Sequence, residues 1–152
     1  GQGTWLCLSR SKYLLNRFKK ILDKLESICE SESKGALPVC VGYEKMHGNQ
    51  YLRIIPTSSE LLEYTINSEE RQYNVDLIYY FDGKMLNTKA VDHILRYTSR
   101  IEALIHDNLI MTLSDNSKAL NCRIQSTVLN NDENDVYMVE MEWQCNHVGN
   151  IG

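Results

Sequence analysis

Two cysteines and a histidine near the end of the chain have the types and spacing of metal ligands. Cys145 and His147 are one residue apart, and Cys122 would join them if the segments that carry these residues pair. A structural zinc site usually takes four nitrogen or sulfur ligands from two local pairs. Because a second short pair is missing, buried and inert cysteines explain this pattern better than a metal site.

A histidine beside a carboxylate, at His106 and Asp107, suggests a general base oriented by an acid. No nucleophile is identifiable that would complete a triad with them. His106 and Asn108 also suit the last turn of a helix, where such side chains often meet the final carbonyls. We therefore interpret this segment as a helix end.

Glu140 and Glu142 share one face of a predicted strand and have the spacing of paired catalytic carboxylates. However, Arg123 and Gln125 are expected opposite them, and an arginine partner lowers the pKa of a carboxylate. This favours a structural or interface role. Since the sequence also lacks the phosphate-loop, zinc-protease and serine-hydrolase motifs, we expect neither enzymatic activity nor a cofactor.

Composition favours one ordinary globular domain over residues 1–152. Twenty acidic residues against sixteen basic ones give a net charge of −4, which argues against a broad surface for nucleic-acid phosphates. No apolar run approaches a membrane span, and no secretory signal precedes the first helix. The five cysteines are odd in number and widely spread, as expected of reduced thiols in an intracellular protein.

Hydrophobic periodicity indicates two helices and five strands. The longer predicted helix, 87–108, lies in the middle of the order, and residues 57–72 are expected to form a polar excursion or loop. In chain order, the predicted elements are an amphipathic helix at 13–29, strands at 37–45 and 50–56, a strand at 72–81, the helix at 87–108, and strands at 122–129 and 136–145.

The last two strands predict an antiparallel hairpin in a definite register. Pairing Leu129 with Val136 puts Tyr137, Val139, Met141 and Trp143 on one apolar face, and sets Arg123 opposite Glu142 and Gln125 opposite Glu140. The expected fold class is α+β: a largely antiparallel β-sheet, with the N-terminal amphipathic helix and the long central helix packed on one face, and a C-terminal β-hairpin.

The order of these patterns resembles the tail terminator (tail completion or neck) proteins of tailed bacteriophages. The resemblance spans residues 13–147. It is carried by "LPVCVGYE", "QYLRIIPTSSE", "RQYNVDLIYYF" and the closing "VYMVEMEWQCNHV". It rests on element order and patterning, without a signature motif.

This resemblance implies a structural virion protein of the tail or neck, assembled in the host cytoplasm. Six copies would form a ring that caps the tail tube and joins it to the head–tail connector or neck protein. DNA would pass through the ring without specific binding, and no membrane would be involved. Catalytic residues are not expected in this family.

Six charged residues are the interface candidates. Our hypothesis is that the segment 65–72 projects toward the tube or the lumen, and a solvated mobile loop is the alternative. A different function, a monomeric adaptor that binds a peptide at an exposed edge of the terminal strand, also remains open, and a small enzyme using Cys145 and His147 comes third. The interface candidates are Glu69, Glu70, Arg71, Arg123, Glu140 and Glu142.

Overall fold

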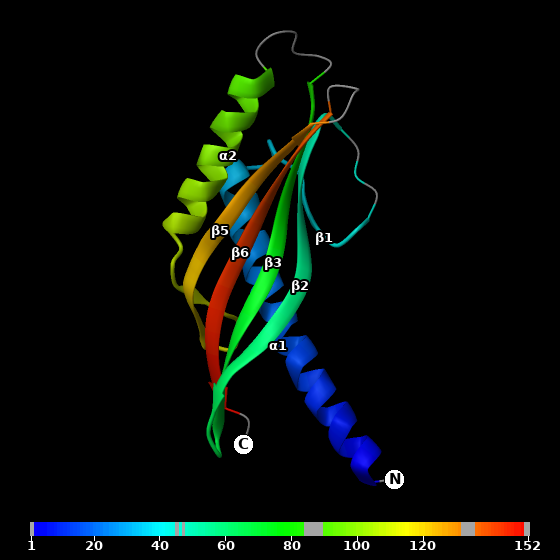
Figure 1. Cartoon of the computed structure of the whole chain (residues 1–152), viewed down its shortest axis with the longest axis vertical. Coiled ribbons are helices and arrows are strands. Elements are labelled where there is room, and N and C mark those ends of the chain that lie inside the picture. The colour runs from blue at the N-terminus through cyan, green and yellow to red at the C-terminus, as the bar shows by residue number, and fades with distance from the viewer. Residues whose placement is uncertain (1, 45, 47, 84–89, 132–135, 151–152) are drawn as a thin grey trace.

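One long, curled β-sheet dominates the computed structural model of this protein, and two helices pack against it (Figure 1). The structure describes residues 2–44, 46, 48–83, 90–131 and 136–150, and within these ranges the side chains of residues 16 to 149. The elements are α1 (Gln2–Ser33), β1 (Val39–Val41), β2 (Gln50–Tyr64), β3 (Ser68–Asp82), α2 (Ala90–His106), β4 (Met111–Thr112), β5 (Lys118–Asn131) and β6 (Val136–Asn150).

The sheet is mixed, with the strand order β1-β2-β3-β6-β5-β4. β1 runs parallel to β2, and the other neighbours are antiparallel. β2, β3 and β6 each have 15 residues, so the twist that accumulates along them curls the sheet. Neither helix in the described part of the chain has the length and apolarity needed to span a bilayer.

The predicted fold class is therefore wrong. The sheet is curled and mixed, and the terminal strands are no separate hairpin, because β6 lies inside the sheet between β3 and β5. The predicted central helix has 17 residues and lies along the β5 margin, whereas α1, with 32 residues, is the longer helix (Figure 1). Element order could not reveal this arrangement, since it does not fix which strands become neighbours.

α1 forms because its apolar residues recur every three or four positions. Ile21, Leu25 and Cys29 form its buried stripe, and Phe18 meets the ring of Tyr73 edge-on at 5.0 Å. The helix ends where Lys34 and Gly35 take positive φ values, with Gly35 at 86°. A left-handed residue after a helix is the usual helix stop, and glycine adopts it without strain.

The inner face of the sheet supplies the rest of the core. From Tyr73 onward in β3 and from Val139 onward in β6, every second side chain is buried, and the polar Asn74 and Gln144 are buried between them. The predicted burial of the apolar face of β6 is confirmed for Val139, Met141 and Trp143, which have no exposed surface, while Tyr137 is partly buried. The buried residues of β3 are Tyr73, Val75, Leu77, Tyr79 and Phe81.

The predicted excursion at 57–72 is in fact regular strand. Its first half completes β2, its second half begins β3, and a tight turn joins them, where the backbone N–H of Thr65 donates to the carbonyl oxygen of Ser68 at 2.8 Å. Two bulges, at Pro56/Ser58 and Leu61/Glu63, break the strict alternation. Bulges and polar side chains hide the period of two that would identify a strand.

The register predicted between the last two strands is also wrong. Arg123 pairs with Gln144 rather than with Glu142, and Glu142 and Glu140 lie opposite Ser126 and Val128. Two irregularities in β5, at Leu120/Arg123 and Ile124/Ser126, shift the pairing. A pattern of apolar and polar residues does not reveal such bulges. The connection at 132–135 lies outside the described residues.

Candidate functional site

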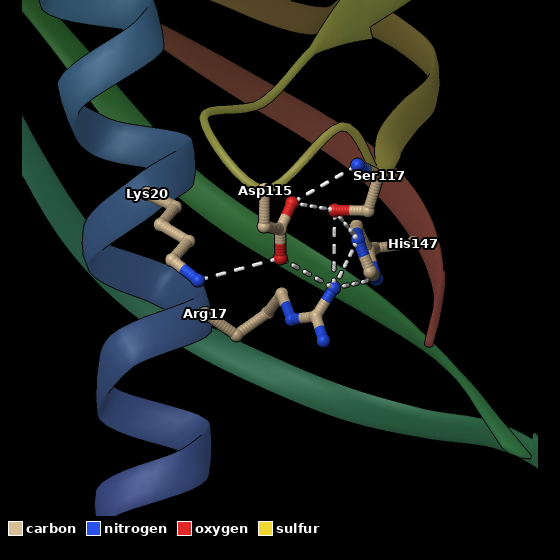
Figure 2. Close-up of polar contacts among 5 residues, drawn as sticks. All are labelled: Arg17, Lys20, Asp115, Ser117 and His147. Atoms are coloured by element: carbon tan, nitrogen blue, oxygen red, sulfur yellow. Dashed lines mark hydrogen bonds and ion pairs between the residues drawn. The ribbon is translucent and has the colours of Figure 1, made fainter. Parts of the chain in front are cut away.

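A group of polar side chains joins α1 to the far end of β6 and to the turn between β4 and β5 (Figure 2). Arg17 Nη1 lies 2.6 Å from His147 Nε2 and 3.2 Å from Ser117 Oγ. Asp115 accepts a short hydrogen bond from Ser117 Oγ and forms an ion pair with Lys20 Nζ at 3.4 Å. We call these five residues the clasp; Arg17 and His147 are buried within it.

Burial and the neighbouring guanidinium of Arg17 lower the pKa of His147 to about 4, so this imidazole is neutral at pH 7. The hydrogen bonds from Ser117, together with Lys20, hold the pKa of Asp115 below its ordinary value. The clasp therefore carries two cations and one anion, with a neutral histidine between α1 and β6.

A serine beside a histidine invites comparison with nucleophilic catalysis. In such sites the carboxylate orients the histidine by accepting a hydrogen bond from its second ring nitrogen. Here Asp115 binds Ser117 instead, and Arg17 lies 3.3 Å from the Nδ1 atom of His147. This geometry suits a structural connection between elements that are 130 residues apart in the sequence.

The proposed metal ligands are only partly brought together. The thiols of Cys122 and Cys145 are hydrogen-bonding neighbours in the core, and the hydrogen bond with Cys122, together with burial, raises the pKa of Cys145. His147, however, is engaged by Arg17 and Ser117. Among the described residues, no group of three or more histidine, cysteine or acidic side chains has a geometry that would hold a metal ion.

The helix-end interpretation of residues 106–108 is confirmed: α2 ends at His106, and Asn108 Nδ2 donates to the carbonyl oxygen of Leu104 at 2.8 Å.

Glu140 and Glu142 lie on the outer face of the sheet, where Glu142 is directly opposite Asp76 of β3. Burial and these two glutamates raise the pKa of Asp76. Glu142 accepts hydrogen bonds from Ser126 Oγ at 3.3 Å and Gln144 Nε2 at 3.0 Å rather than from an arginine. The outer face therefore carries a cluster of negative charge.

Arg123 belongs to the same outer face, at the edge of the sheet. Its guanidinium donates to Gln144 Oε1 at 2.8 Å, to the carbonyl oxygen of Asn121 at 2.9 Å and to Gln125 Oε1 at 3.2 Å. These described partners are all neutral oxygens. Arg123 consequently presents a positive charge beside a strand edge.

Glu69, Glu70 and Arg71 lie in β3, between β2 and β6, so they are part of the sheet and not of a loop. Arg71 Nε donates to Glu69 Oε1 at 3.0 Å, and both side chains are largely shielded from solvent. This ion pair stabilises the base of the β2–β3 turn. Their role in an interface remains a prediction.

Two strand edges lack a described neighbour along most of their length. β4 pairs with β5 only at Lys118 and Ala119, so residues 123–131 have no described strand on that side. We call residues 123–131 the β5 edge. β1 pairs with β2 only from Leu52 to Ile54, so the later residues of β2 have no described strand on that side. We call residues 57–64 of β2 the arm. Unpaired N–H and C=O groups along such edges are ready to pair with another chain.

The arm and the adjoining turn lie at one end of the sheet (Figure 1), and their apolar side chains are exposed. Tyr64 is 70% exposed and Ile66 94% exposed, and Leu61 and Leu62 are each nearly half exposed. Large apolar side chains gathered at a projecting end are typical of a contact surface. The Leu61–Tyr64 cluster is visible in the sequence, but only the strand assignment shows that it lies on an edge.

A groove of about 590 Å³ runs between α2 and the beginning of the β5 edge. Ala103, Ile105 and Ile124 give it apolar walls, and Arg123 and His106 add basic groups. Thr127 Oγ1 donates to Glu102 Oε1 at 2.7 Å and so bridges strand and helix at the groove. The groove therefore lies alongside an open strand edge.

Comparisons with known proteins give likeness of fold alone. No family model and no curated protein matches the chain. One solved chain, from the virion of a native gene transfer agent particle, is 9% identical with a TM-score of 0.48, covering 82% of this chain and 84% of that one. Another solved protein, which bears only a sequence identifier, is 15% identical with a TM-score of 0.53, covering 86% and 92%. Since the first score is below 0.5, only the second supports a shared fold.

Proposed function

We propose that this chain is a structural protein of a phage-like virion. Within that class we propose a tail terminator: a six-membered ring that caps the tail tube and joins it to the head–tail connector. The protein would act in the tail or neck after assembly in the host cytoplasm. It would need no catalytic residue and no cofactor.

The observation that carries this proposal is the pair of long strand edges on opposite margins of one sheet, the arm and the β5 edge. In a head-to-tail assembly, one surface of each copy binds a different surface of the next copy, and the copies form a ring when the rotations between them add up to a full turn. A ring subunit therefore needs two different surfaces that complement each other. The resemblance of the sequence pattern to tail terminators supports the specific role.

The test is the absolute mass of the purified protein by light scattering over a concentration series, combined with electron images of the large species. Closed six-membered rings are expected, either alone or after tail tubes are added as a template. A protein that stays monomeric at all concentrations and does not co-sediment with tail tubes would contradict the proposal.

The groove beside the β5 edge also favours a second candidate, an adaptor domain that takes up a partner peptide as an added strand. The edge in question is β5, since β6, for which we first considered this role, is internal. A monomer that binds extended peptides in this groove would favour the adaptor over the ring subunit.

A further inference from the structure

We propose that the arm of one copy adds as a strand to the β5 edge of the next copy, with its apolar side turned toward the groove below α2. This inference rests on the proposed function, because it names the contact that would hold the ring together. It assigns the arm and the β5 edge as partners in a head-to-tail contact between identical chains.

The directions of the two edges suit this pairing. Each strand from β2 through β3 and β6 to β5 is antiparallel to the one before it, so β2 and β5 run in opposite directions. When two copies with the same orientation stand side by side, the arm of one therefore meets the β5 edge of the other as an antiparallel strand. Antiparallel pairing is the slightly more stable arrangement per residue.

The lengths and levels of the two edges are compatible with a closed ring. The middle of the β5 edge, Thr127, is level with Leu77 of β3, and the middle of the arm, Glu60, is level with Gln72. The edges are thus offset by five residues, about 17 Å at roughly 3.4 Å per residue, over four strands spaced about 4.8 Å apart. If the strands are tilted by about 40° to the ring axis, this offset brings the two edges together with no shift of the next copy along the axis. Strands in closed barrels are tilted by about 35–45°.

Charges match on the outer face of the joined sheet. Arg123 packs on Gln144, and Glu60 and Glu63 pair with Gln72 and Glu70, so all three charged side chains project from the same outer face. The arm carries these two acids and no base, whereas Arg123 is the charged residue of the β5 edge. In this pairing the guanidinium gains a carboxylate in place of neutral oxygens.

Apolar groups match on the inner face. Leu61 and Tyr64 lie opposite Arg71 and Glu69, on the side of β2 that faces the helices, and both are exposed in the single chain. On β5, Leu129 is 47% exposed on the corresponding face, and Ile124 lines the groove. Pairing the edges covers these side chains, which supplies the hydrophobic part of the contact.

The residues of the β5 edge themselves offer little protection against strand addition. Soluble proteins guard such edges with charges, prolines, short strands or a covering helix. Here α2 lies along this margin, where Glu102 accepts a hydrogen bond from Thr127, but no described strand pairs with residues 123–131 on their free side. The nine residues of this edge, "RIQSTVLNN", contain one charge and no proline, and Val128 and Leu129 remain about half exposed. An edge of this kind is expected to be covered in the assembled protein.

Reversal of the charges tests the contact directly. In the full chain, Arg123→Glu should raise the dissociation constant of the oligomer at least about tenfold, because like charges then face each other. Adding Glu60→Arg and Glu63→Arg to the same chain should restore association. Arg100→Glu, an exposed change on α2, is the matched control and should leave the mass unchanged.

Cross-linking gives a second measurement that does not depend on the stability of the charge variants. A Glu63→Cys, Arg123→Cys chain treated with a short thiol cross-linker should form a covalent ladder up to the complete ring, while each single variant should not. The native Cys29, Cys40, Cys122 and Cys145 are buried, and Cys7 is replaced by serine in all of these chains.

The outcomes separate this inference from the proposed function. Rings that survive Arg123→Glu and give no ladder would overturn the arm-to-β5 contact and leave the ring function standing. Failure to form rings under any condition would remove the function itself. Rings that fail with Arg123→Glu, recover with the reversed partners and form a ladder would establish the contact.

Discussion

Replacement of His147 by glutamine should remove much of the protein's loss of stability in mild acid. Burial and Arg17 lower the pKa of His147 from its ordinary 6.5 to about 4 in the folded protein. Between these two pH values the unfolded chain binds a proton that the folded chain does not, so the free energy of unfolding falls as the pH falls.

The magnitude follows from the same shift. One pKa unit corresponds to about 1.4 kcal/mol, so a shift from 6.5 to about 4 makes His147 responsible for a loss of about 3 kcal/mol when the pH falls through this window. Asp115 titrates outside the window, since its pKa is lowered and its stabilising effect is lost only at more acid pH. The raised pKa of Asp76 acts in the opposite direction. The effect of His147 is therefore measured as the difference between the wild type and a His147 variant in how the free energy of unfolding depends on pH.

The assay is denaturant unfolding at a series of pH values from 7.5 to 4.5, followed by tryptophan fluorescence. The wild type should lose about 2–3 kcal/mol more than His147→Gln over this range. The exposed His106 gives the matched control, and His106→Gln should follow the wild type. Arg17→Met should flatten the curve in part, because the guanidinium is one cause of the shift.

Parallel curves for the wild type and His147→Gln would refute this reasoning. They would mean that the folded protein accepts the proton on His147 at little cost. The clasp would then have to open in mild acid, or its histidine would have to be reached by solvent. Either result would remove the buried neutral imidazole from the account of how α1 is attached to β6.

Three further predictions concern the core, the outer face and the arm. Trp143→Ala should cost about 3–5 kcal/mol of unfolding free energy, because the indole is fully buried, as denaturant titration would show. Asp76→Asn should stabilise the protein by roughly 0.2–1 kcal/mol at neutral pH by removing the repulsion from Glu142, and this gain should shrink as the pH falls and the wild-type carboxyl binds its proton. Reversal of Glu69 and Glu70 to lysine should weaken co-sedimentation with tail tubes. Because the Glu69–Arg71 ion pair is also lost, the melting temperature should fall slightly, and unchanged co-sedimentation would separate these residues from the tube contact.

Buried alternation was the most predictable part of this fold. Between Tyr73 and Phe81 in β3 and between Tyr137 and Trp143 in β6, every second residue is large and apolar, and this pattern determines which side faces the core. Patterns failed where geometry departs from the ideal. The bulges in β2 and β5 shift register without a clear sequence signal. Val91 and Leu95 fit the apolar stripe of α2 and yet are about half exposed.

The candidate site was less predictable, because it depends on contacts between distant segments. His147 stood out in the sequence as a possible metal ligand, but its actual partner, Arg17, lies 130 residues away on a helix with several similar basic residues. Likewise, the sequence pattern placed Arg123 on a strand and opposite the wrong partner, and its position beside an open edge follows from the strand order alone. Local patterns do not contain that information.

The clasp and the arm are physically connected through the sheet. His147 pairs across the strands with Arg71, and Arg71 pairs with Leu61 in the middle of the arm. The arm has no described neighbour on its free side, so its position depends on β3 and on the part of β6 that the clasp ties to α1. Segments with few buried contacts open before the rest of a protein does. A weakened clasp is therefore expected to release the arm, and with it the proposed contact between copies, under conditions where the core around Trp143 is still folded.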